Sequence, residues 1–433
     1  MSLAARLRAL RLDLTPLRTS RDFRLLFVAG TVFYLGGMVT YVAVPFQVYR
    51  VTGSNLAVGA IGLVELVPLV VFGLYGGALA DHVDRRRLLV ASGLAQAAAT
   101  AVLAVNAAGL LGGQHVWLVF VVAAVLSATS SLQRPSREAL MPRTVRHDEL
   151  PAANALTSLG MQIGVLVGPA IGGLLIAYVG LGWCFVVDVA GLLVASAMYA
   201  AMSAYPHREE TTPPSLAGVR AGLEYALRRR DLLGTYLVDI AAMLLAMPVV
   251  LFPALVEDVF QRPELLGLLY SAETVGALLA TALSGWTGRV HHHGRAIVLA
   301  AAAYGGCVAL AGLMPSFWLV ALFLALSGAA DMISGVFRGI VWSQTIPEAM
   351  RGRLAGIEML SYSLGPLGGQ VRAGVTADLW SVRGAITSGG VACVAGVGLT
   401  AAWLRDFWSY DSRTDPHAVA ERATRAAAGE SQA

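Results

Sequence analysis

The sequence predicts an all-α membrane protein of about twelve transmembrane helices, arranged as two pseudo-symmetric six-helix bundles. The first observation is composition: 57% of the 433 residues are hydrophobic and only 13% are charged, whereas soluble proteins carry about 25% charged residues. The second is a series of apolar runs, each long enough for a bilayer core that needs about 20 residues. The third is that short motifs of the first half recur in the second half.

Hydropathy and charge together predict where the spans lie and how they are oriented. Short connections rich in arginine stay in the cytoplasm, and the even-numbered connections contain Arg85 to Arg87, Arg143, Arg146, Arg289, Arg295, Arg351 and Arg353. This bias predicts that both termini are cytoplasmic. The spans are expected near 25–49, 56–80, 88–110, 116–138, 153–179, 182–203, 233–256, 265–287, 296–314, 317–343, 354–377 and 384–404.

The expected organisation has five parts. The central loop is polar and contains prolines, and its stretch Ser215 to Arg230 keeps apolar residues at helical spacing, which favours a surface helix. The tail from Ser409 is polar and rich in alanine and arginine, which favours disorder. The parts are a cytoplasmic N-terminal segment 1–24, a bundle 25–204, a cytoplasmic central loop 205–232, a second bundle 233–404 and a cytoplasmic tail 405–433.

Several classes of function are disfavoured by residues that the sequence lacks. It contains no lysine, so it has no Walker A motif, and uphill transport would have to use an ion gradient or a partner. The cysteines Cys184, Cys307 and Cys393 lie in apolar runs, so no disulfide, metal site or cofactor is expected. Neither H-E-x-x-H nor G-x-S-x-G occurs, so we expect no catalytic residues and no enzyme. The net charge of +4 reflects topology and not nucleic-acid binding.

The stretch Gly76 to Arg87, GGALADHVDRRR, joins the second and third spans. An ordinary cytoplasmic loop would explain its arginines, but not the spacing G-x-x-x-D-x-x-x-R-R at the end of a membrane helix. That spacing resembles the loop 2–3 signature of the major facilitator superfamily. The resemblance implies that fold and a gate in which Asp81 latches the two halves. His82 departs from the signature, which usually has arginine there. The gating residues implied are Gly77, Asp81, Arg85 and Arg86.

A glycine motif in the fifth span indicates the direction of transport. Glycines at these spacings give a smooth face for close helix packing, and Pro169 removes one backbone hydrogen bond and bends the helix. The motif resembles that of drug/proton antiporters in the same superfamily, whose members mostly export; generic small-residue packing is the alternative. Its residues are Gly164, Gly168, Pro169, Gly172 and Gly173.

The resemblance extends along nearly the whole chain. GPAIGG at Gly168 to Gly173 recurs as GPLGG at Gly365 to Gly369, and Arg134 to Pro142 recurs as Arg338 to Pro347. Two six-span halves with internal repeats are typical of major facilitator transporters. The stretches RDFRLLF, VTGSN, TIPEAMRGRLAG and LFPALVEDVF look like the branch that exports siderophores, drugs and macrolides, in the bacterial inner membrane.

Ionisable residues within spans are costly and are functional candidates by default. Arg134 could instead extend to the cytoplasmic surface, and Asp188 is expected to bond to neighbouring helices. An acid in such surroundings is suited to carrying a proton from one side to the other. The candidates for proton or substrate binding are Glu65, Arg134, Asp239, Glu273, Asp331 and Glu358.

The function predicted is secondary active transport, as a proton-coupled exporter of small siderophore-like or drug-like molecules working by alternating access. The expected partners are a small-molecule cargo, protons and membrane lipid, with no nucleic acid, and the expected working state is a monomer. The alternatives are multidrug or macrolide efflux without a siderophore role, a nutrient importer, and a membrane sensor or scaffold that transports nothing.

Overall fold

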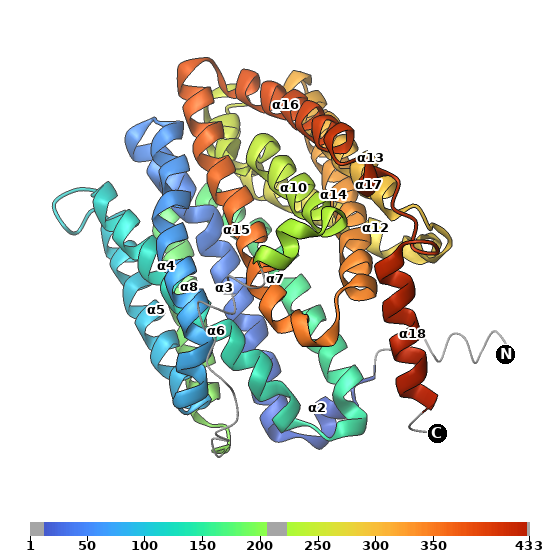
Figure 1. The fold of residues 1–433 in the computed structure, drawn as a ribbon. Coiled ribbons are helices and arrows are strands. Elements are labelled where there is room, and N and C mark those ends of the chain that lie inside the picture. The colour runs from blue at the N-terminus through green and yellow to red at the C-terminus, as the bar shows by residue number, and fades with distance from the viewer. Residues whose placement is uncertain (1–12, 206–222, 431–433) are drawn as a thin grey trace, which may run out of the picture. The chain divides into compact units, whose positions relative to one another are not determined.

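The structure is a computed structural model that describes residues 13–205 and 223–430. Within its helices, the side chains at 73–82, 348–349, 351–353, 355–357, 359–360 and 428–430 are outside the description. All elements among the described residues are helical, which confirms the all-α class (Figure 1). Eleven helical segments of the described residues are long and apolar enough to cross a membrane. The helix α15, Glu348–Leu379, covers the remaining predicted span.

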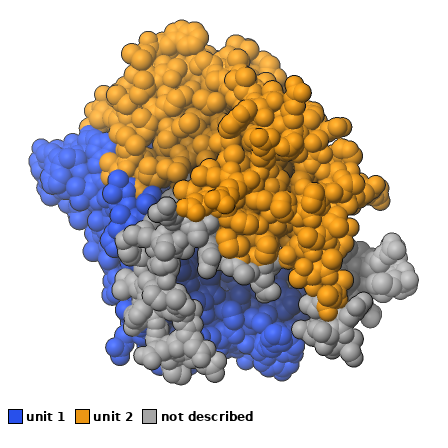
Figure 2. Space-filling view, in the orientation of Figure 1, with its two compact units in different colours: residues 1–47, 67–213 blue, residues 48–66, 214–433 orange. Residues whose placement is uncertain are grey.

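The chain divides into two compact units, coloured separately in Figure 2. Unit 1 contains residues 1–47 and 67–213, and unit 2 contains residues 48–66 and 214–433. The sequence places 48–66 in the first half, but its contacts group it with unit 2. The helices from the N-terminus to the end of unit 1 are α2 Thr15–Thr19, α3 Arg21–Thr52, α4 Asn55–His82, α5 Arg85–Ala107, α6 Val116–Thr144, η1 His147–Glu149, α7 Leu150–Tyr178 and α8 Leu181–Ala200.

In unit 2, the helix α13 packs against α14 and α16, α12 against α14, and α10 against α15 and α16. In the same way α5 packs against α6 and α8 in unit 1. The elements of unit 2 after the central loop are α10 Arg230–Ala246, η2 Val249–Leu251, α11 Phe252–Ala254, η3 Leu255–Val259, η4 Pro263–Leu265, α12 Leu266–Ala282, η5 Ser284–Arg289, α13 His293–Leu313, α14 Phe317–Thr345, α15, α16 Val382–Trp403, α17 Arg405–Trp408 and α18 Pro416–Glu430.

The seventh span is broken, which hydropathy did not predict. The helix α10 ends at Ala246, Met247 is extended with ψ of 108°, and short helical turns follow up to Val259. Pro248 has no N–H and disfavours a helical conformation in the residue before it. The hydroxyl of Tyr304 on α13 donates to the carbonyl of Ala246 at 3.4 Å, so one carbonyl freed by the break is bonded. Interrupted spans of this kind occur near the binding sites of transporters.

The prediction of disorder from Ser409 onward is wrong for residues 416–430, which form α18, and the short helix α17, residues 405–408, directly precedes that stretch (Figure 1). Phe407 is fully buried against α10 and α13, where Gly234 and Gly294 have no side chain to exclude it. Arg425 on α18 donates to the carbonyl of Ser343 on α14 at 2.7 Å. Tertiary packing therefore orders a segment whose composition favours disorder. The predicted surface helix is seen only as helical residues 223–228, because 206–222 lie outside the described residues.

Candidate functional site

The predicted gating motif connects the end of α4 to the start of α5. The side chains of Gly77 and Asp81 lie outside the described residues, so the predicted latch stays a prediction. Asp84 caps α5, accepting hydrogen bonds from the backbone of Arg86 at 2.9 Å and of Arg87 at 3.4 Å. The Arg86 guanidinium donates to the carbonyl of Ala200, the last residue of α8. A cation at a helix C-terminus is favourable because it opposes the negative end of the helix dipole.

Arg85 contributes a second contact within unit 1. Its guanidinium lies 3.5 Å from the carbonyl oxygen of Ala139 on α6. Together, Arg85 and Arg86 connect the start of α5 to two neighbouring helices. Two of the four predicted gating residues, Arg85 and Arg86, thus join helices at one end of unit 1.

The glycines of the fifth span form one face of α7, which packs directly on α3. A Cβ added at Gly164 would lie 2.6 Å from the Cβ of Tyr34, and one added at Gly168 would lie 2.9 Å from the carbonyl oxygen of Leu35. At Gly172 the nearest atom would be the Val39 carbonyl oxygen, 3.3 Å away. Pro169 and Gly173 are also buried in this helix. The two helix backbones therefore approach each other more closely than side chains would allow.

The repeat in the eleventh span packs in the corresponding way. A Cβ at Gly365 on α15 would lie 2.9 Å from the Cβ of Met243 on α10, and Gly369 also faces the Met243 backbone. Since α3 and α10 begin the two halves, the sequence repeat corresponds to a repeated helix–helix contact.

Unit 2 contains a chain of charged side chains that crosses three helices. Arg338 on α14 forms an ion pair with Asp239 on α10, and both side chains are at most 5% exposed. The Ser361 hydroxyl of α15 donates to Asp239 at 3.0 Å. Asp331, two turns before Arg338 on α14, lies 3.8 Å from the same guanidinium and is 43% exposed. One arginine therefore faces two acids.

Glu273 on α12 extends this chain to a third acid. Gly328 on α14 faces the Glu273 backbone directly, which brings the two helices close together one turn from Asp331. The Glu273 carboxyl group interacts electrostatically with that of Asp331, and both interact with the Tyr304 hydroxyl. The Glu273 Oε1 atom is buried and has no hydrogen-bond partner among the described residues. We call Asp239, Arg338, Asp331 and Glu273 the acid–arginine chain.

The other predicted residues lie apart from this chain or at its edge. Glu358 on α15 interacts with Tyr236 and Tyr362, and the Tyr362 ring lies 5.9 Å from the Arg338 guanidinium. Glu65 is partly buried on α4. Arg134 is 75% exposed and pairs with Glu138 one turn later at 3.0 Å. This placement agrees with the alternative that Arg134 extends to the surface.

Sequence reasoning missed Arg137, one turn after Arg134 on α6. Arg137 is partly buried, and its guanidinium lies over the rings of Phe33 and Tyr34 on α3. The sequence repeat aligned Arg134 with Arg338, whereas the helix bounds in the structure align Arg137 with Arg338. Both α6 and α14 have 29 residues, and Arg137 and Arg338 each lie 21 residues after the first residue of their helix.

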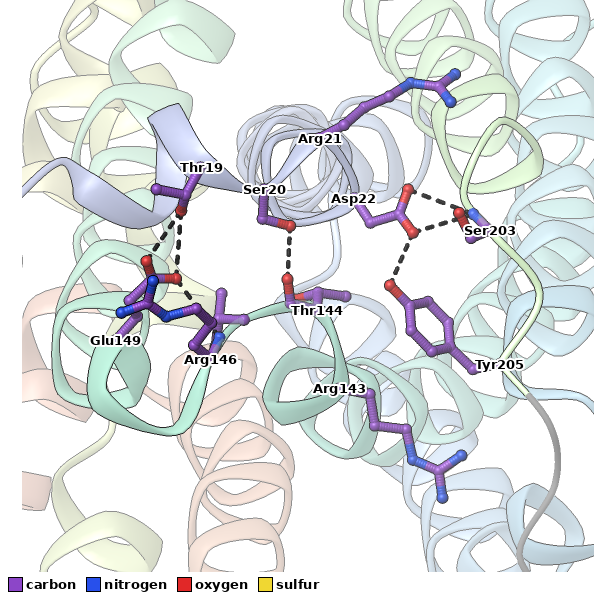
Figure 3. A pocket seen from close by; sticks show the side chains of 11 residues that line it. Thr19, Ser20, Arg21, Asp22, Arg143, Thr144, Arg146, Glu149, Ser203 and Tyr205 are labelled. Carbon is purple, nitrogen blue, oxygen red and sulfur yellow. Dashed lines mark hydrogen bonds between the residues drawn. The ribbon is translucent and has the colours of Figure 1, made fainter.

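A cavity of about 450 Å³ lies at one end of unit 1, where α3, α6 and η1 meet the segment after α8 (Figure 3). Asp22 accepts hydrogen bonds from the Tyr205 hydroxyl at 2.7 Å and from the Ser203 backbone at 3.2 Å. Glu149 accepts one from the Thr19 hydroxyl at 3.1 Å. Burial and the bond to Asp22 raise the pKa of the Tyr205 phenol. The carboxylates of this cavity are thus used to hold helix ends together.

Asp378, at the end of α15, caps α4 within unit 2. Its carboxylate accepts hydrogen bonds from the backbones of Asn55 and Leu56 at 2.9 and 3.0 Å, and from the hydroxyl of Ser54 at 2.7 Å. Tyr49, at the end of α3, donates to Asp258. A carboxylate at a helix N-terminus satisfies free N–H groups and favours the positive end of the helix dipole.

We expect Asp378→Ala to lower the free energy of unfolding by about 1 kcal/mol, the usual effect of losing a helix cap. Asp378→Asn should lose less, because asparagine is also a good cap. Thermal unfolding of the purified protein in detergent measures both. Asp415→Ala is the matched control, since Asp415 caps only the tail helix α18. Equal losses at the two positions would show that the cap on α4 has no special importance.

Comparison with solved structures defines the fold. The chain is similar to a bacterial homologue of the iron transporter ferroportin, with a TM-score of 0.69 and 16% identity over 90% of this chain and 99% of that one. It is similar to the nucleoside transporter NupG, with a TM-score of 0.68 and 11% identity over 89% of this chain and 98% of that one. The fold is that of the major facilitator transporters.

The sequence comparisons then give the family. The chain belongs to the transmembrane secretion effector family, whose model matches residues 12–422. It is 28% identical over 399 residues to the enterobactin exporter EntS of Shigella flexneri, covering 89% of this chain and 92% of that protein. It is 26% identical over 387 residues to EntS of Escherichia coli O81 (strain ED1a), with the same coverage. The relatives and the proteins that share the fold are transporters and not enzymes.

Proposed function

We propose that this chain is a proton-coupled exporter that moves small amphipathic molecules across the bacterial inner membrane by alternating access. The acid–arginine chain of unit 2 carries the proposal. Ionisable residues within membrane spans commonly mark proton relays, and here four of them lie on three neighbouring helices. The arginine bias of the loops supports cytoplasmic termini, and a monomer suffices for this mechanism.

Asp331 and Glu273 are the proposed proton-binding pair. Arg338 is already neutralised by Asp239, with which it forms the more buried pair. Asp331 is farther from Arg338 and more exposed, and Glu273 has a buried oxygen without a partner. Binding one proton to the pair would relieve the repulsion between two carboxylates and supply a donor for the unpartnered oxygen. Asp239 and Arg338 would hold the helices around this pair.

The direction and the cargo are proposed from the family and the relatives. The family is described as secretion effectors, and the similar proteins are enterobactin exporters. These names support export and favour a siderophore-like cargo over a drug-like one. Efflux of drugs or macrolides without a siderophore role is the alternative, supported by the antiporter-like glycine face of α7.

The test is uptake of enterobactin into everted vesicles that contain the full-length protein, with erythromycin as the second probe. We expect an imposed proton gradient, acidic inside, to drive accumulation of enterobactin, because each proton that leaves down a difference of one pH unit releases about 1.4 kcal/mol. Dissipating the gradient should abolish accumulation. Glu273→Gln and Asp331→Asn should retain exchange of labelled for unlabelled cargo but lose accumulation.

The possible outcomes test proton coupling, cargo class and export separately. Gradient-driven accumulation that is unchanged in both variants would exclude coupling through this pair. Accumulation of erythromycin alone would favour the macrolide alternative. No accumulation of either probe, with the protein inserted normally, would contradict the exporter proposal for these cargo classes and favour a sensor or scaffold.

A further inference from the structure

We infer that Arg137 of unit 1 binds a carboxylate group of an anionic cargo. This inference rests on the proposed transport function and adds the charge of the molecule that is carried. The site is formed by α3 and α6, and all of its residues belong to unit 1. It shares no residue with the acid–arginine chain, which belongs to unit 2.

Two aromatic rings hold the Arg137 side chain in position. Its guanidinium carbon lies 4.5 Å from the ring centroid of Phe33 and 4.5 Å from that of Tyr34. The two rings stand at 79° to each other with their centroids 5.8 Å apart. Tyr34 is itself held by the close contact of its backbone with Gly164 on α7. A guanidinium that lies over a ring contacts it through its flat face, whereas its N–H donors lie in its plane and point outward.

These donors have no acidic partner among the described residues. Arg137 forms no ion pair there, and its Nη1 atom is buried without a hydrogen-bond partner. The nearest acid in sequence, Glu138, pairs with Arg134 on the outer side of α6. Asp188 of α8 accepts a hydrogen bond from the Thr40 hydroxyl at 2.5 Å through one oxygen, and it forms no ion pair with Arg137. A buried cation without an anion is costly, because ring contacts recover only part of the lost hydration.

In the second half of the chain, the arginine at the equivalent position is neutralised by carboxylates of the protein itself. Arg338 occupies the equivalent position of α14 and has two carboxylates, Asp239 and Asp331, within reach. The position on α6 that corresponds to Asp331 is Ser130, whose hydroxyl is bonded to Gln96 on α5. Unit 1 thus keeps the arginine of the repeat but not this acid. The guanidinium also interacts with the uncharged phenol of Tyr199 on α8, which leaves its charge to be neutralised by a ligand.

The shape of the site favours a planar acid. A guanidinium edge matches a carboxylate, which accepts two parallel hydrogen bonds from it. Gly30 on α3 lies beside the unpartnered Nη1 atom, since a Cβ added there would lie 3.8 Å from Nη1. Arg137, Phe33 and Tyr34 are all partly exposed in unit 1. A carboxylate could therefore approach the N–H edge of the Arg137 guanidinium from the exposed part of the site, while the rings of Phe33 and Tyr34 contact its faces.

The test compares benzoate with benzamide, its neutral isostere, by isothermal titration of the purified full-length protein. We expect the wild type to bind benzoate about tenfold more tightly or better than benzamide, the factor expected for a charged hydrogen bond. Arg137→Gln should lose this preference. Arg137→Lys should recover part of it, because lysine keeps the charge but not the planar pair of donors. Gly30→Leu should weaken benzoate binding with the charge intact, because it fills the space beside Nη1.

Arg134→Gln removes the same charge from the same helix one turn away and should keep the preference for benzoate. Equal affinity of the wild type for benzoate and benzamide would overturn the inference, and so would unchanged benzoate binding by Arg137→Gln. Loss of the preference in Arg134→Gln, but not in Arg137→Gln, would assign the site to the other arginine. Binding needs no gradient, so a negative result here leaves proton-coupled export standing, and failed export leaves the binding result standing.

Discussion

Asp239→Asn is expected to lower the free energy of unfolding by about 3–5 kcal/mol, the usual loss when one partner of a buried ion pair is removed. The substitution leaves the Arg338 guanidinium, 5% exposed, without its principal anion in an apolar interior. Transport should be lost as well, because α10 and α14 would no longer be held together beside Asp331. Thermal unfolding of the purified protein and uptake into everted vesicles measure the two effects.

Two further variants distinguish the ion pair from a general loss of charge. Glu138→Gln breaks the exposed pair with Arg134, and should change stability by no more than about 1 kcal/mol. The double variant Asp239→Leu with Arg338→Met removes both buried charges, and should recover most of the stability but not the transport. If the double variant is as unstable as Asp239→Asn, packing and not the unpaired charge causes the loss.

Gly168→Leu is expected to abolish export and to destabilise the protein by more than about 3 kcal/mol, beyond the usual cost of overpacking. The added side chain would have to occupy the space of the Met38 Cβ atom and of the Leu35 carbonyl oxygen, and the second of these is a backbone atom of α3. Backbone atoms cannot move aside as a flexible side chain can, so α7 and α3 would have to separate. Transport in vesicles and thermal unfolding report the effect.

Gly398→Leu is the matched control for this substitution. Gly398 lies on α16, is exposed, and has no atom within 4 Å of an added Cβ. The same change in volume should therefore be tolerated there. Similar export by the two variants would mean that the glycine face of α7 is not needed for transport.

Part of the candidate site follows from the sequence. The acids of the acid–arginine chain stand out because charged residues are rare in apolar spans, and Asp239, Glu273 and Asp331 were found in this way. The sequence could not show that Arg338 pairs with two of them, since they are on different helices. It also favoured Arg134 over Arg137. Which arginine of α6 faces inward depends on the rotation of that helix about its axis, and hydropathy does not measure rotation.

The break in the seventh span and the ordered tail show the same limit. The sequence shows Pro248, but a proline within a span can either bend a helix or end it. Here the Tyr304 hydroxyl bonds the carbonyl of Ala246, which the break leaves free, so a residue of another helix stabilises the break. Phe407 lies two residues before the segment whose composition favours disorder. It is ordered because two distant glycines, Gly234 and Gly294, leave room for its ring and backbone.

The membrane class, the approximate bounds of the spans and the family resemblance could all be predicted from the sequence. These depend on local properties: apolar length, arginine in short loops, and motifs with fixed spacing. Only the packing of the helices shows which charged residues meet, which arginine lacks an acidic partner among the described residues, and which helix end Asp378 caps. Such contacts join residues that are hundreds of positions apart, as Asp378 and Asn55 are. Their geometry depends on how each helix is rotated and packed, which a single sequence does not record.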